Sequence, residues 1–64
     1  MLVNGQEKTL GSEATVKDFL ESEGYKLHRV VVEKNGVIVP KKNFETEKLF
    51  ETDKVEIIWF VGGG

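Results

Sequence analysis

The stretch DKVEIIWFVGGG, residues Asp53 to Gly64, decides the fold that we expect for this chain of 64 residues. Its first part, Val55 to Val61, is the strongest strand candidate in the sequence, because β-branched and aromatic side chains are enriched in strands. Side chains alternate between the two faces of a strand, so one set should project toward a core: Val55, Ile57 and Trp59. We expect Ile58 and Phe60 to project from the opposite face.

The stretch ends in three glycines, Gly62, Gly63 and Gly64. Average glycine usage is only about 7%, so chance is a poor explanation for three in a row. Glycine accepts nearly all backbone conformations, and three of them are able to thread a narrow channel and present a terminal carboxylate about 10 Å beyond the fold. We therefore expect a folded domain over residues 1–61 and a flexible tail over residues 62–64.

The first half of the chain predicts a hairpin followed by one helix. Asn4-Gly5 is a strong turn signal, which predicts strands over residues 1–3 and 6–10. Thr15 precedes apolar residues at helical spacing, and its hydroxyl is suited to accept a main-chain N–H of the first helical turn. Gly24 is suited to the left-handed conformation that follows a helix. These signals predict about ten helical residues between Thr15 and Gly24.

The second half adds further strands before the last one. Three consecutive valines predict a strand from Arg29 to Lys34. Asn35-Gly36 is a second turn signal, and the extended segment after it, Val37 to Val39, ends at Pro40, which has no N–H to donate to a ladder. Thr52-Asp53-Lys54 predicts the turn that leads into the last strand.

A helix that follows a hairpin buries its apolar stripe only by crossing the sheet. The sequence therefore predicts an α+β roll, with a mixed sheet of four to five strands, one main helix on one face and a flexible C-terminal glycine tail. A long connection separates the first and last strands, so we expect them to lie parallel and side by side at the centre. The expected core has these members: Val3, Leu10, Val16, Phe19, Leu20, Val30, Val32, Ile38, Phe44, Leu49, Val55 and Ile57.

Composition argues against several classes of function. The chain has no cysteine, and His28, its only histidine, has no second ligand at metal-binding spacing, so we expect no metal. A net charge of −2 without a basic block disfavours nucleic acid and anionic membranes as partners. No apolar run approaches the roughly 18 residues that span a bilayer. We expect a cytoplasmic protein that binds no cofactor and is not an enzyme.

Several segments together resemble the ThiS family, the bacterial sulfur carriers of thiamine thiazole synthesis. They are the Asn4-Gly5 turn, ATVKDFL at Ala14 to Leu20, NGVIVPKKNF at Asn35 to Phe44, and DKVEIIWFVGGG at Asp53 to Gly64. The resemblance covers essentially the whole chain and implies the ubiquitin-like β-grasp fold. Two positions depart from the family pattern: Gly62 extends the Gly-Gly pair to three, and Lys8 stands on the second strand where an apolar inward residue is expected.

The resemblance implies that other enzymes act on the tail. A ThiF-type adenylyltransferase would activate the Gly64 carboxylate with ATP, and sulfur from a cysteine desulfurase or related donor would convert it to a thiocarboxylate. A ThiG-type thiazole synthase would then consume the thiocarboxylate, while Gly62 and Gly63 provide reach. Large apolar side chains beside the tail are typical of a protein interface, so we expect this partner-binding surface: Ile58, Phe60 and Val61.

Other functions stay open at this point. A MoaD-type carrier, the small subunit of molybdopterin synthase, also ends in Gly-Gly, although MoaD-like chains are usually longer before the last strand. A small β-grasp binding module with an added tail would carry no chemistry. Loop residues that cover Ile58 and Phe60 would leave no partner surface there.

Overall fold

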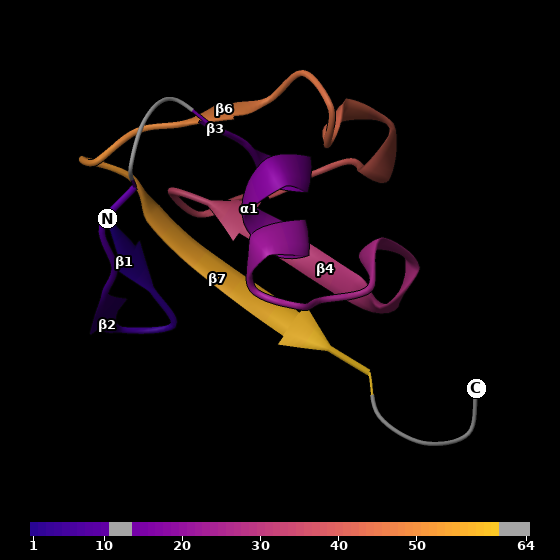
Figure 1. The fold of residues 1–64 in the computed structure, drawn as a ribbon, viewed down its shortest axis with the longest axis horizontal. Helices are drawn as coiled ribbons and strands as arrows, with labels where there is room; N and C mark the ends of the chain where they lie inside the picture. Colours follow the sequence, from indigo (N-terminus) through magenta and orange to yellow (C-terminus); the bar gives the residue numbers. More distant parts are fainter. Residues whose placement is uncertain (11–13, 61–64) are drawn as a thin grey trace.

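The computed structural model describes residues 1–10 and 14–60 of the chain. A five-stranded sheet, in the order β2-β1-β7-β4-β5, carries one α-helix across one of its faces (Figure 1). The predicted α+β roll with a mixed sheet is therefore confirmed. The sheet and the helix that covers it consist of β1 (Leu2–Val3), β2 (Gln6–Glu7), α1 (Val16–Ser22), β4 (Val30–Lys34), β5 (Val37–Val39) and β7 (Lys54–Trp59).

Strand β7 lies at the centre of the sheet, as the sequence predicts. It runs parallel to β1, with Val3 opposite Val55, and antiparallel to β4, with Val30 opposite Trp59. The strand expected over residues 55–61 begins one residue earlier, at Lys54, and ends at Trp59. The last residue of that expectation, Val61, lies outside the described residues.

Both Asn-Gly pairs form tight turns with positive φ angles. Asn4 and Gly5 have φ angles of 51° and 82°, and Asn35 and Gly36 have 52° and 84°, which is the backbone that joins two strands through a two-residue loop.

The second strand is shorter than expected. It ends at Glu7 instead of residue 10. The N–H of the next residue, Lys8, donates to the Met1 carbonyl at 2.8 Å. The Lys8 side chain leaves the sheet and its Nζ forms an ion pair with Glu23 Oε1 at 2.8 Å. This contact explains how a lysine is accommodated at a position where an apolar residue was expected.

Helix α1 is flanked by the predicted cap residue Thr15 and by the predicted Gly24. The Thr15 hydroxyl accepts from the Asp18 N–H at 3.1 Å, and the Asp18 carboxylate accepts from the Thr15 N–H at 3.3 Å, so the two residues cap the first turn reciprocally. At the other end Gly24 adopts a φ of 83°, and the Tyr25 N–H donates to the Leu20 carbonyl at 2.9 Å. The helix has seven residues, fewer than the ten expected.

A second, two-stranded sheet that the sequence does not predict fastens the start of the helix. It pairs β3 (Ala14–Thr15) with β6 (Lys48–Leu49), and main-chain hydrogen bonds from Val16 and Lys17 to the segment before β6 extend it. The short 3-10 turns η1 (Leu27–Arg29) and η2 (Lys41–Asn43) complete the connections.

The core lies between α1 and the sheet and contains ten of the twelve expected residues. The prediction that Ile38 lies in the core is wrong. Ile38 pairs with Glu33 across β4 and β5, projects away from the helix and is 61% exposed. Val39, opposite Val32, takes its place in the core, because a shift of one residue along a strand exchanges the two faces. Leu10 is only partly buried against the core, and Met1 is a buried member that we did not expect.

Candidate site at the end of the central strand

The end of β7 is held by β4 on one side and by the side chain of Asn4 on the other. Beyond the strand, the Phe60 N–H donates to the Arg29 carbonyl at 3.0 Å, which extends the contact with the β4 side. On the β1 side, the Asn4 side chain bonds to the main chain of Ile57 at 2.8 and 3.2 Å. The expected tail residues Gly62, Gly63 and Gly64 lie outside the described residues, as does Val61. The structure thus fixes the strand from which the tail departs.

Ile58 and Phe60 project from the side of the sheet that α1 does not cover. They are 48% and 59% exposed, so the alternative in which loop residues bury them is wrong. Val31, directly opposite Ile58 on β4, extends the apolar surface. We use the name open face for the residues on this side of the sheet: Val31, Glu33, Ile38, Glu56, Ile58 and Phe60. Exposed apolar area of this kind is typical of surfaces that bind other proteins.

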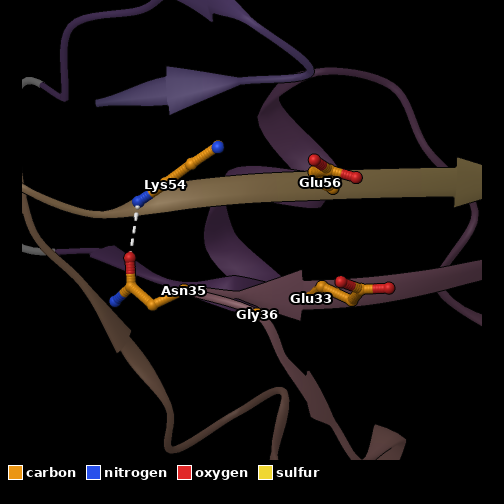
Figure 2. Close-up of a pocket in the computed structure, with 5 residues that line it drawn as sticks. All are labelled: Glu33, Asn35, Gly36, Lys54 and Glu56. Carbon is orange, nitrogen blue, oxygen red and sulfur yellow. Dashed lines mark hydrogen bonds between the residues drawn. The ribbon is translucent and has the colours of Figure 1, made fainter.

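The open face also carries a pair of carboxylates. Glu33 on β4 lies directly opposite Glu56 on β7, and Figure 2 shows the two side chains next to each other on neighbouring strands. They line a depression of about 380 Å³ together with Asn35, Gly36 and Lys54. Neither glutamate was predicted as a site residue, because their proximity depends on the register between two strands and not on a motif along the chain.

Trp59 departs from the expectation that its face of β7 is buried. Its side chain lies on the helix side of the sheet, yet it is 50% exposed, because α1 ends at Ser22 and does not extend over it. Its ring contacts Tyr25 in the segment after the helix, with the ring centroids 5.7 Å apart. The end of β7 therefore presents large apolar side chains on both faces of the sheet.

A buried carboxylate holds the other end of β7. Asp53 is 8% exposed, and its carboxylate accepts hydrogen bonds from the Phe50 N–H at 2.8 Å and from Asn35 Nδ2 at 3.0 Å, with Lys34 Nζ at 3.7 Å. Burial by itself raises the pKa of Asp53, but the hydrogen bonds from Asn35 and Phe50 and the charge of Lys34 outweigh it and lower the pKa below its ordinary value. This network fixes the turn before β7.

No group of three or more His, Asp or Glu side chains within residues 1–10 and 14–60 could hold an ion, and His28 is exposed in η1. No helix in that part of the chain is long and apolar enough to cross a membrane.

Comparison with known proteins shows similarity along the whole chain. A sequence model of the ThiS family matches residues 1–64. The sulfur carrier protein ThiS of Bacillus subtilis (strain 168) is 35% identical over 63 residues, which cover 97% of this chain and 96% of that protein. The crystal structure of the thiamine biosynthesis protein ThiS from Geobacter metallireducens has a TM-score of 0.82 at 30% identity, and the match covers 98% of this chain and 96% of that one. The expected ubiquitin-like β-grasp fold is confirmed by this likeness.

A much longer protein also contains a similar segment. The thiazole synthase of Paramagnetospirillum magneticum (strain ATCC 700264 / AMB-1) is 36% identical over 64 residues. The match covers 100% of this chain but only 20% of that protein, so the chain spans about a fifth of the length of this relative.

Proposed function

Because this chain belongs to the ThiS family, we propose that it is a sulfur carrier of thiamine biosynthesis whose Gly64 carboxylate is converted to a thiocarboxylate. The similarity to the B. subtilis sulfur carrier over nearly the full length of both chains is the observation that carries this proposal. A carrier presents a reacting group, and its partner enzymes supply the catalysis. The chain is thus a substrate of enzymes and not an enzyme.

The proposed chemistry begins at the ionised carboxylate. An α-carboxylate has a pKa of about 3.3 to 3.7 in model peptides and is charged at neutral pH. Held by a ThiF-type adenylyltransferase, the Gly64 carboxylate attacks the α-phosphate of ATP, and pyrophosphate leaves. Persulfide sulfur from a cysteine desulfurase or related donor, reduced by two electrons from a thiol to the sulfide level, then attacks the carbonyl of the acyl-adenylate, and AMP leaves. ATP binds to the activating enzyme, and the carrier binds no cofactor of its own.

The described part of the chain is suited to this role. Partners on both sides hold β7, so the point from which the tail departs has a defined position against any enzyme that grips the fold. Ile58 and Phe60 offer that enzyme exposed apolar area close to the tail, and we propose that they bind the adenylyltransferase together with Val61. Gly62 and Gly63 add no side chains that would obstruct a narrow active-site channel.

We propose a ThiG-type thiazole synthase as the enzyme that takes the sulfur from Gly64. The likeness of this chain to a segment of a thiazole synthase supports this choice, because segments that work together in one polypeptide are also expected to work together as separate chains. A cytoplasmic location is consistent with enzymes that use ATP. Transfer of sulfur to thiazole synthase also distinguishes this role from that of a MoaD-type carrier.

Mass spectrometry tests the proposal. The chain is incubated with ATP, magnesium, sulfide and a ThiF-type adenylyltransferase, then treated with iodoacetamide, which alkylates a thiocarboxylate but has no cysteine to alkylate in this chain. We expect replacement of oxygen by sulfur, which adds about 16 Da, and rapid alkylation of the product. A sample without ATP and a chain lacking Gly64 are the controls and should stay unmodified. An unmodified full-length chain in the complete mixture would refute the proposal.

A further inference from the structure

The carboxylates of Glu33 and Glu56 are placed together by the register of β4 and β7. The two residues are Cα partners in the antiparallel pair, and their neighbours Val32 and Ile57 are buried on the helix side. Alternation therefore directs both glutamates to the open face, as Figure 2 shows. Residues directly opposite on antiparallel strands have Cβ atoms about 4.5 to 5.5 Å apart, a spacing at which like charges destabilise the sheet.

The ion pairs of three lysines in the described ranges involve carboxylates other than Glu33 and Glu56. These lysines are Lys8, Lys17 and Lys34. Lys54 lines the same depression as the two glutamates but forms no ion pair with either of them. The chain thus carries two neighbouring carboxylates on its open face.

Apolar residues flank the pair on two sides of the open face. Ile38 lies opposite Glu33 on the other side, so Ile38, Glu33 and Glu56 form one row across three strands. The next row toward the end of β7 contains Val31 and Ile58. A protein that covers these rows removes water from the two carboxylates, which strengthens their attraction to a cation placed between them. The surface therefore matches a partner with an apolar patch around a basic side chain.

We infer that the open face docks on thiazole synthase through an arginine or lysine of that enzyme, which enters between the carboxylates of Glu33 and Glu56. The inference rests on the proposed function and names the two side chains by which the partner enzyme recognises the carrier. Arginine is the better match, since its planar fork can donate to two carboxylates at once. Thiazole synthase is the occupant because the chain resembles a segment of one such enzyme, so a segment of this kind and the rest of a thiazole synthase occur in one polypeptide.

Binding measurements with charge-neutralised variants test the inference. The affinity of the chain for thiazole synthase is measured by isothermal titration calorimetry at several salt concentrations, for wild type, Glu33→Gln, Glu56→Gln and the double variant. Glu21→Gln is the matched control, because Glu21 is an exposed carboxylate on α1, away from the open face. We expect Kd to rise about tenfold or more in the double variant, with a weaker salt dependence, and to stay unchanged in the control.

Thermal unfolding of the same variants separates recognition from folding. Loss of either charge removes the cross-strand repulsion, so Tm should stay the same or rise while binding weakens. A double variant that binds thiazole synthase as tightly as wild type would overturn the inference, as would a defect confined to adenylylation, which would assign the pair to the activating enzyme. Failure of the wild-type chain to acquire sulfur would instead refute the proposed function, so the two failures are distinguishable.

Discussion

The side chain of Asn4 exchanges two hydrogen bonds with the main chain of Ile57. Its Oδ1 accepts from the Ile57 N–H at 2.8 Å, and its Nδ2 donates to the Ile57 carbonyl at 3.2 Å. The ladder between β1 and β7 has only two residue pairs, so this side chain extends it by imitating a strand. A turn residue near the N-terminus thereby positions the strand that leads to Gly64.

Replacement of Asn4 tests this arrangement. Asn4→Gly keeps the positive φ of 51° but removes both side-chain bonds, and we expect the free energy of unfolding to fall by about 1 to 2 kcal/mol. Asn4→Ala should cost more, because alanine also resists that backbone conformation. Urea denaturation measures both. Equal midpoints for Asn4→Gly and wild type would show that the contact with Ile57 contributes nothing.

The register of β5 predicts that truncation of Ile38 lowers the free energy of unfolding far less than truncation of a core residue. Leu20→Ala removes a fully buried side chain and should lower the free energy of unfolding by about 2 to 5 kcal/mol. Ile38→Ala removes an exposed one and should change it by about 0.5 kcal/mol or less. Chemical denaturation measures the two values. A loss at Ile38 as large as that at Leu20 would contradict the register.

Asp53 predicts how stability depends on pH. Its pKa is lower in the folded state than the ordinary value of 3.8, so the unfolded chain binds the proton more tightly. The stabilisation is therefore fully present above the unfolded pKa and is lost as the pH falls through the folded pKa. Asp53→Asn should flatten this acid limb of the stability curve, which urea midpoints at several pH values would measure. If Asp53→Asn loses stability at low pH as wild type does, other carboxylates cause that loss.

The sequence predicts those parts of the fold that short, strong local signals specify. The Asn-Gly turns, the Thr15 cap and the apolar run of β7 each have a single low-energy solution, and the topology follows from them. The choice between Ile38 and Val39 could not be made, since a three-residue strand has too little alternation to fix its register. The pair of β3 and β6 was missed because two residues on each strand leave no pattern at all.

The candidate site was predictable only in part. The exposure of Ile58 and Phe60 follows from alternation along one strand. The opposition of Glu33 and Glu56 depends on which residues of β4 and β7 meet, which no local feature of either strand specifies. The exposure of Trp59 depends on where α1 ends relative to the sheet, and the helix is shorter than its start and stop signals suggested.

Truncation of the exposed apolar residues tests their part in activation. We expect Ile58→Ala and Phe60→Ala each to reduce kcat/KM for adenylylation by about 5- to 30-fold, because contact with the adenylyltransferase would lose about 1 to 2 kcal/mol. Val37→Ala is the matched control, since Val37 is an exposed apolar residue at the far end of the sheet. Pyrophosphate release measures the rates. Unchanged rates in both variants would remove these residues from the interface.

The position of the acquired sulfur tests directly whether Gly64 carries it. Lys54 is the last lysine, so cleavage after lysine yields a fragment of residues 55–64 that contains Gly64 and lacks Met1, the only methionine, whose oxidation would also add about 16 Da. Fragment-ion mass spectrometry then locates the change within this peptide. We expect an alkylatable sulfur on Gly64 that requires both ATP and sulfide. Sulfur on any other residue, or none on this fragment, would contradict it.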